Sequence, residues 1–181
     1  FAGYERITLA DYNTTLNSTL TASLANAAQL THQGEAGFNG TYIDVDLNYN
    51  GNVGWNTNMV RFYASDRYKD SYNLAWETTG QLIIWRYDNA QAHTILGRVK
   101  NIADFGISGP SDWFNAKLKI DAKVNASDAT KQTVYLELYL NGKLAFTYTV
   151  EEVNAAATRN KIFVNTSSSI SARVPMDVQE E

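Results

Sequence analysis

The chain has 181 residues, of which 44% are hydrophobic and 19% are charged, and its formal net charge is -4. This length and composition are typical of one globular domain and exclude a disordered chain. The acidic balance, without a lysine- or arginine-rich stripe, argues against nucleic acid as a partner. The absence of cysteine excludes disulfides, thiolate chemistry and cysteine-ligated zinc.

The sequence also argues against histidine-based sites and membrane-spanning helices. His32 and His93 lie far apart, and no His-Glu-x-x-His motif occurs, so we expect no histidine-based metal site or catalytic triad. No apolar run approaches the roughly 18 residues that a membrane-spanning helix needs, so we expect no membrane insertion. Because the sequence starts at Phe1, we expect residues 1–181 to be a single domain excised from a larger secreted protein.

The hydrophobic pattern predicts one strand after another from about residue 38 onward. The clearest strand is WFNAKLKIDAKV, in which Leu118 and Ile120 lie on the apolar face and Lys117 and Lys119 on the polar one. The stretch LNSTLTASLANAAQL is ambiguous, and we interpret it as strand and loop. Pro175 indicates an edge or bulged strand, because proline has no N–H to donate. The predicted strands are 41–49, 59–64, 72–77, 81–87, 94–99, 113–124, 134–140, 144–150, 161–165 and 170–178.

A β-hairpin is predicted in VYLELYLNGKLAFTYTV, where Asn-Gly separates two alternating runs. A two-residue turn with regular pairing would put the two apolar sets on opposite faces of the sheet. A three-residue loop of Leu140, Asn141 and Gly142 restores the parity, with a positive φ at Gly142. In that register Leu138 faces Leu144, and Leu136 faces Phe146.

The order of these segments resembles the concanavalin A-like lectin/glucanase superfamily, in its laminin-G-like and carbohydrate-binding-module branch. GTYIDVDL, MVRFYA, YNLAWETTGQLIIWRY and TILG are followed by DWFNAKLKIDAKV and VYLELYLNGKLA, over about residues 38–150. The resemblance implies an all-β fold, a two-sheet antiparallel β-sandwich of the jelly-roll type. Its motifs are structural, so the function has to be argued from a site.

A sugar-binding face is predicted on the strand positions opposite the inferred core. Aromatic rings stack on sugar rings, and arginine, asparagine and glutamate side chains bridge neighbouring hydroxyls. Trp55 adds an aromatic residue in the polar loop NVGWNTN, and loops often carry function. Alternatively, these aromatic residues pack under loops or belong to the core. The predicted ligand-binding residues are Arg61, Tyr63, Asn73, Glu77, Trp85, Tyr87 and Trp55.

The sequence supports a catalytic site or a metal site less than it supports a sugar-binding face. Glucanases of the resembling superfamily carry a Glu-x-Asp-x-x-Glu strand, whereas this chain reads YIDVDLNYN, with Asp44 and Asp46 but without the flanking glutamates. Lectins of that fold often bind Ca²⁺ through loop oxygens, which Asp66, Asp70, Asp88 and Asn89 offer here. Their spacing matches no EF-hand, so we assign no metal ion, no cofactor and no catalytic residue.

The sequence therefore favours a non-catalytic, lectin-like glycan-binding module of a secreted or cell-surface bacterial protein, with a polysaccharide or glycan and other domains of the parent protein as partners. Two alternatives stay open. One is a glycan-active enzyme, either a glycoside hydrolase or a polysaccharide lyase, on the same fold. The other is an adhesion module that binds protein.

Overall fold

The computed structural model describes residues 4–8, 19–23, 39–50, 56–65, 69–153, 159, 161–165 and 170–176. The described part of the chain is almost entirely β-structure, with the 3-10 helix η2 (Ile102–Phe105) between two strands. No helix in these ranges is long and apolar enough to cross a membrane. The strands are β1 (Glu5–Ile7), β2 (Thr19–Ser23), β3 (Asn39–Tyr49), β4 (Thr57–Ala64), β5 (Ser71–Trp76), β6 (Leu82–Tyr87), β7 (His93–Val99), β8 (Phe114–Val124), β9 (Lys131–Leu140), β10 (Lys143–Val153), β11 (Lys161–Asn165) and β12 (Ile170–Arg173).

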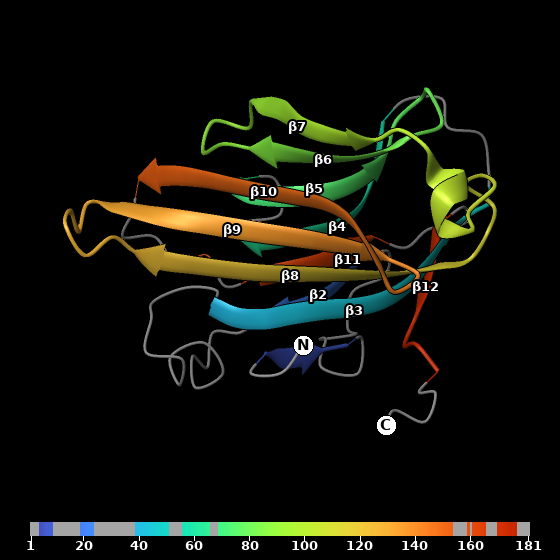
Figure 1. The fold of residues 1–181 in the computed structure, drawn as a ribbon, viewed down its shortest axis with the longest axis horizontal. Helices are drawn as coiled ribbons and strands as arrows, with labels where there is room; N and C mark the ends of the chain where they lie inside the picture. Colours follow the sequence, from blue (N-terminus) through green and yellow to red (C-terminus); the bar gives the residue numbers. More distant parts are fainter. Residues whose placement is uncertain are drawn as a thin grey trace.

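The described strands form two sheets that pack face to face (Figure 1). The first sheet has the order β1-β3-β8-β9-β10, and the second has the order β2-β11-β4-β5-β6-β7. Neighbouring strands run antiparallel, except that β1 runs parallel to β3. The molecule is a two-sheet β-sandwich of the jelly-roll type, which confirms the predicted fold class. The strand β2 agrees with the strand part of the interpretation of residues 16–30, whose other residues lie outside the described ranges.

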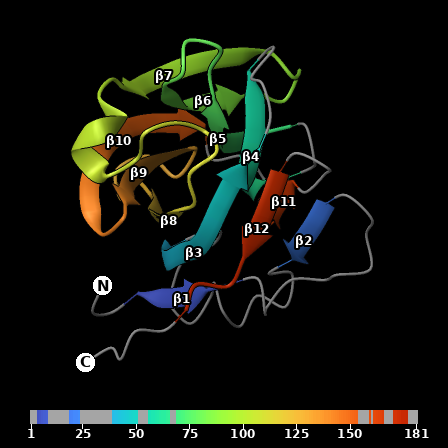
Figure 2. The ribbon, with the colours of Figure 1, turned by 90° about the vertical axis from the view of Figure 1, so that its right-hand side faces the viewer.

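The strand β3 lies at the outer side of the first sheet and is paired twice along the same edge. Its residues 41–43 pair with β1, and its residues 46–49 pair with β12 (Figure 2). Elements from both ends of the described chain therefore meet on one strand. β12 ends at Arg173, so the predicted strand 170–178 is too long: residues 174–176 are not strand, and Pro175 has no N–H to continue the pairing with β3.

The hydrophobic core lies between the two sheets and follows the predicted alternation. In β8 every second side chain is buried from Phe114 to Ala122, while the side chains between them are partly exposed. The Trp76 ring from the second sheet meets the Phe114 ring edge-on, with ring centroids 6.0 Å apart. This pair joins the two layers through close aromatic packing.

The β9–β10 hairpin differs in one detail from the prediction. Asn141 and Gly142 form a two-residue turn, with φ of 50° and 83°, and Leu140 pairs with Lys143. The positive φ at Gly142 is confirmed, but the three-residue loop and its register are wrong. The extra residue lies instead in β10, where the register shifts between Leu144 and Phe146. Phe146 consequently faces Leu138, and the inward parity of β10 is restored by a bulge at Ala145 rather than by the turn.

Candidate functional site

The second sheet is buried on both of its faces over β4, β5 and β6. Side chains that alternate away from the inter-sheet core form a second small apolar cluster of Ala75, Ile83 and Trp85. Tyr87 and Ile95 pack against this cluster while remaining partly exposed. We call this outward surface, with Arg61, Asn73, Trp85, Tyr87 and His93, the aromatic face.

A polar row crosses the aromatic face from strand to strand. Arg61 is in register with Asn73, and Asn73 is in register with Trp85. Arg61 Nη1 donates to Asn73 Oδ1 at 3.2 Å, and Asn73 Nδ2 donates to Ser71 Oγ at 3.0 Å. These bonds satisfy polar groups that would otherwise be costly to bury, and they fix the positions of the side chains around the rings.

Three rings form the aromatic part of this face. The ring centroid of Trp85 lies 5.5 Å from that of Tyr87 and 4.8 Å from that of His93, and both contacts are edge-on. The Arg61 guanidinium lies 5.1 Å from the Tyr87 ring centroid, a distance typical of a cation–π contact. Asn58 accepts a hydrogen bond from Trp85 Nε1 and donates to the Tyr87 hydroxyl at 3.5 Å.

Access to this face is limited to one end. Arg61, Asn73 and Trp85 are only 6%, 0% and 5% exposed. Tyr87 is half-buried, and His93 is exposed at the start of β7. Of the five residues, a ligand therefore reaches Tyr87 and His93 first, while the other three lie beneath or beside them.

Glu77 also points outward from the second sheet, but at the opposite end of the face. Its two carboxylate oxygens accept hydrogen bonds from Arg98 at 2.8 Å each, and Thr79 Oγ1 donates to it at 2.8 Å. The hydrogen bonds from Arg98 hold the pKa of Glu77 below its usual range. Both oxygens of this carboxylate are therefore already occupied by protein donors.

Tyr63 does not share the aromatic face, so the prediction that it lies beside Arg61 is wrong. Its φ is 52°, which breaks the strand alternation and turns the ring into the inter-sheet core. There it stacks on Tyr72, with ring centroids 6.4 Å apart, and its hydroxyl donates to Gln132 Oε1 at 3.0 Å. The predicted Trp55 lies outside the described residues.

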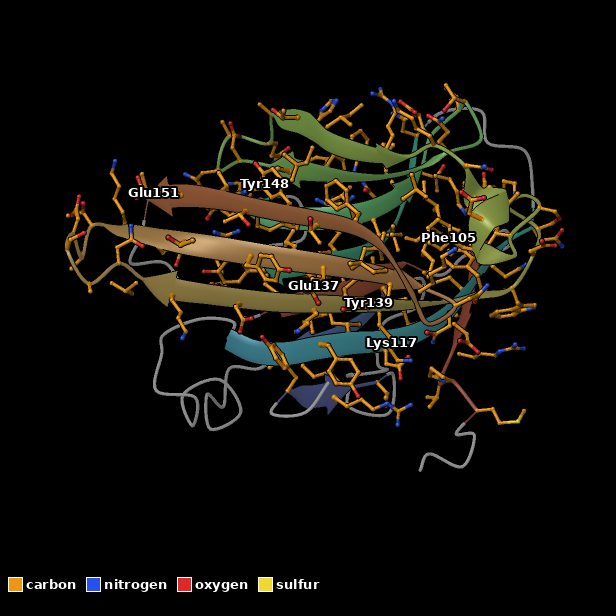
Figure 3. The ribbon with its side chains drawn as sticks, in the orientation of Figure 1. Phe105, Lys117, Glu137, Tyr139, Tyr148 and Glu151 are labelled. Carbon is orange, nitrogen blue, oxygen red and sulfur yellow. The ribbon has the colours of Figure 1, made fainter. Side chains whose placement is uncertain are left out.

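The outward surface of the first sheet carries a different set of polar and aromatic side chains. Lys117, Glu137 and Tyr139 lie close together on β8 and β9 (Figure 3). Glu137 accepts hydrogen bonds from the hydroxyls of Tyr135 and Tyr139 and lies 3.3 Å from Lys119 Nζ. We call Lys117, Lys119, Tyr135, Glu137 and Tyr139 the tyrosine face.

The two aspartates of β3 lie beside this surface and are held by cations. Asp44 accepts from Arg6 Nε at 2.8 Å, and Asp46 accepts from Arg173 Nε at 3.3 Å. Asn115 Nδ2 donates to both carboxylates, at 2.8 and 3.1 Å. Each aspartate thus has its own arginine, and one amide joins the two.

A buried charge cluster at one end of the sandwich was not predicted from the sequence. Glu152 of β10 is contacted by Arg86 Nε at 3.1 Å and by Arg159 Nη1 at 2.5 Å. The Tyr72 hydroxyl and Gln132 Nε2 also donate to it. The sequence could have indicated part of this cluster, because the alternation of β9 and β10 turns the polar residues Gln132 and Glu152, which are paired, toward the core.

Two of the loop carboxylates considered for Ca²⁺, those of Asp70 and Asp88, have protein partners in the structure. Asp70 is paired with Arg86 at 3.3 Å, and Asp88 accepts the backbone N–H groups of Ala90 and Ala92. Within the described ranges, no group of three or more histidine, aspartate and glutamate side chains is placed to hold a metal ion. Asp66 lies outside these ranges.

Comparison with known proteins shows similarity of fold but no related sequence. No protein-family model and no curated protein sequence matches the chain. The receptor-binding domain of the botulinum neurotoxin C/D mosaic serotype aligns with 86% of this chain at 12% identity and a TM-score of 0.51; the match covers 35% of the toxin domain. The carbohydrate-binding module CBM66 from Bacillus subtilis aligns with 87% of the chain at 11% identity, over 78% of the module, with a TM-score of 0.46. Sheep galectin-11 aligns with 88% of it at 10% identity, over 100% of the galectin, with a TM-score of 0.43.

Proposed function

We propose that this domain is a non-catalytic carbohydrate-binding module with a lectin-like, concanavalin A-like sandwich, and that it works outside the cell or at the cell surface. The observation that carries the proposal is the open end of the aromatic face. Two accessible rings, Tyr87 and His93, stand there above a buried row of Arg61, Asn73 and Trp85. A ring on a polar, prearranged support is suited to a sugar, which has apolar C–H faces and a rim of hydroxyls.

The supporting residues have separate roles in this proposal. Tyr87 supplies the stacking surface, and His93 extends it across to β7. Arg61 and Trp85 contact the Tyr87 ring, and Asn73 holds Arg61, so that little ordering is needed when a sugar binds. Glu77, at the far end of the face, would contribute only if a longer saccharide extends along β5 and β6. Trp55 stays a prediction from the sequence alone.

The toxin domain of similar fold is described as receptor-binding, which is a binding role. At 12% identity this similarity shows the fold alone. The proposal therefore depends on the chemistry of the aromatic face, and it can be tested on that face directly.

A glycan array with the full chain tests the function, and titration calorimetry on the best ligand tests the site. Tyr87→Ala should weaken binding about tenfold, because it removes the accessible stacking ring. Trp113→Ala is the matched control, since Trp113 is 40% exposed and lies outside the aromatic face. If no glycan binds at millimolar concentration, the function is refuted, whereas binding that Tyr87→Ala leaves unchanged refutes only the site.

The same experiment separates the alternatives. Release of reducing ends from a bound polysaccharide would support a glycan-active enzyme instead. Binding to extracellular proteins that persists after their glycans are removed would support an adhesion module.

A further inference from the structure

The tyrosine face is a rigid hydrogen-bonded surface rather than a set of independent side chains. Glu137 Oε1 accepts from the Tyr139 hydroxyl at 2.8 Å, and the Tyr135 hydroxyl donates to the other carboxylate oxygen. Lys119 Nζ lies 3.3 Å from Glu137 Oε1 and 4.2 Å from the centroid of the Tyr4 ring. One carboxylate thus sets the orientation of two tyrosine side chains on the same strand.

The pKa shifts of these groups agree with their hydrogen bonds. The hydrogen bond to Glu137 raises the pKa of Tyr135 to about 12 and also raises the pKa of Tyr139. The pKa of Glu137 lies below its usual range, because hydrogen bonds from the two tyrosines and Lys119 outweigh the effect of burial. At neutral pH, Glu137 therefore stays an acceptor and the tyrosines stay donors.

The carboxylates of this surface are occupied by protein donors. Glu137 has the three partners given above, and Asp44 accepts from Arg6 and Asn115. Asp121 accepts from the Tyr4 hydroxyl and from the Gly40 backbone N–H. A ligand hydroxyl would have to compete with these donors for the carboxylate oxygens.

Lys117 is different from the other charged groups around it. It stands in register between Asp44 of β3 and Tyr139 of β9, and its side chain is partly buried. Among the described residues it has no hydrogen-bond or ion-pair partner, whereas Asp44 beside it is held by Arg6 and Asn115. Because Arg6 and Asn115 already occupy the Asp44 carboxylate, the Lys117 ammonium group makes no ion pair within the described residues and is available to an anionic ligand.

We propose that the tyrosine face is a second carbohydrate-binding site, selective for acidic saccharides that carry carboxylate or sulfate groups. Lys117 pairs with the ligand's anion, and Tyr139 supplies the adjacent ring for the sugar. Glu137 is a positioning residue that keeps the two tyrosines in place. This site goes beyond the proposed function and is independent of it, because it lies on the opposite sheet from Tyr87.

The test is titration of the full chain with polygalacturonate, which carries carboxylates, with heparin, which also carries sulfates, and with dextran, which is neutral. At least one acidic polymer should bind more tightly than dextran, and its affinity should fall between about 50 and about 500 mM NaCl. Lys117→Gln should weaken that binding about tenfold, whereas Lys117→Arg should retain most of it. Lys100→Gln is the control for loss of one surface charge, and Tyr87→Ala should have no effect on the acidic ligand.

Several outcomes would overturn the inference. Neither acidic polymer binding better than dextran would exclude acid selectivity. Equal effects of Lys117→Gln and Lys100→Gln would show general electrostatic attraction rather than a site. Loss of acidic binding in Tyr87→Ala with no loss in Lys117→Gln would assign the ligand to the aromatic face and leave the proposed function standing.

Discussion

Replacing Glu152 with glutamine should strongly destabilise the fold, because it removes the negative charge at the centre of the buried cluster. The carboxylate receives donors from Arg86, Arg159, Tyr72 and Gln132. Glutamine has the same shape but only one acceptor oxygen, and its amide NH₂ would face groups that are themselves donors. The guanidinium of Arg159 would lose its nearest carboxylate while remaining buried.

The size of the effect follows from the burial of the partners. The side chains of Arg159, Glu152 and Arg86 are 6%, 11% and 19% exposed. Removing one partner of a buried ion pair costs about 3–5 kcal/mol, because the remaining charge is left without compensation. Since the free energy of unfolding of a small domain is about 5–15 kcal/mol, the variant should lose a large part of its stability.

Urea unfolding followed by tryptophan fluorescence measures this loss, provided that a second probe reports the same transition. Glu151→Gln is a matched control on the neighbouring residue of β10. The Glu151 side chain, labelled in Figure 3, is 54% exposed. Its Oε1 lies 3.6 Å from Lys131 Nζ, so loss of this exposed charge should cost about 0–1 kcal/mol. Equal losses of stability in the two variants would refute the assignment of Glu152 as the centre of a buried cluster.

The difference between wild type and Glu152→Gln should also depend on pH. Burial alone would raise the pKa of Glu152, but the charges of Arg159 and Arg86 outweigh it and hold this pKa below its usual range. A carboxyl group with a lowered folded-state pKa stabilises the fold above its unfolded-state pKa and loses this contribution as the pH falls through the folded-state value. The stability gap should therefore be full at neutral pH and narrow in acid, and a gap that widens in acid would contradict the reasoning.

Two further predictions concern glycine positions. Gly97→Ala should destabilise the sandwich, because a Cβ there would lie 2.1 Å from Cε1 of the Phe146 ring. In a double-mutant cycle measured by urea unfolding, Phe146→Leu should relieve part of this loss, and fully additive losses would argue against the contact. Gly142→Ala should cost about 1–2 kcal/mol, because φ is +83° in open space, whereas Gly109→Ala, also in open space but without a positive φ, should change the melting temperature little.

The strand pattern was largely predictable because alternation is a local property of the chain. Inward and outward residues of β8 and β9 follow the sequence period without interruption. Tyr63 was misplaced because a positive φ at a residue other than glycine inverts the alternation and leaves no mark in the hydrophobic pattern. Keeping the apolar residues of both hairpin strands on one face required one extra residue. The alternation alone does not tell whether that residue lies in the turn or, as observed, at Ala145.

The candidate site was less predictable, because burial of an outward face depends on distant parts of the chain. The alternation correctly put Arg61, Asn73 and Trp85 on one side of the second sheet. It did not indicate that these side chains would be almost fully buried there. The partners of Glu152 come from β5, β6, β9 and Arg159, so they could not be assigned before the two sheets were placed together.

The bulge at Ala145 has a consequence for how copies of this domain behave in concentrated solution. β10 has 11 residues and, in the described part of the chain, pairs with β9 alone, so its other side is a sheet edge. A long regular edge is a template onto which a second copy can add its own strand. The bulge near the start of β10 interrupts the even spacing of N–H and C=O groups there and limits the regular edge to residues 146–153. The residue that restores the inward parity of the hairpin thus also shortens the regular edge onto which a second copy could add a strand.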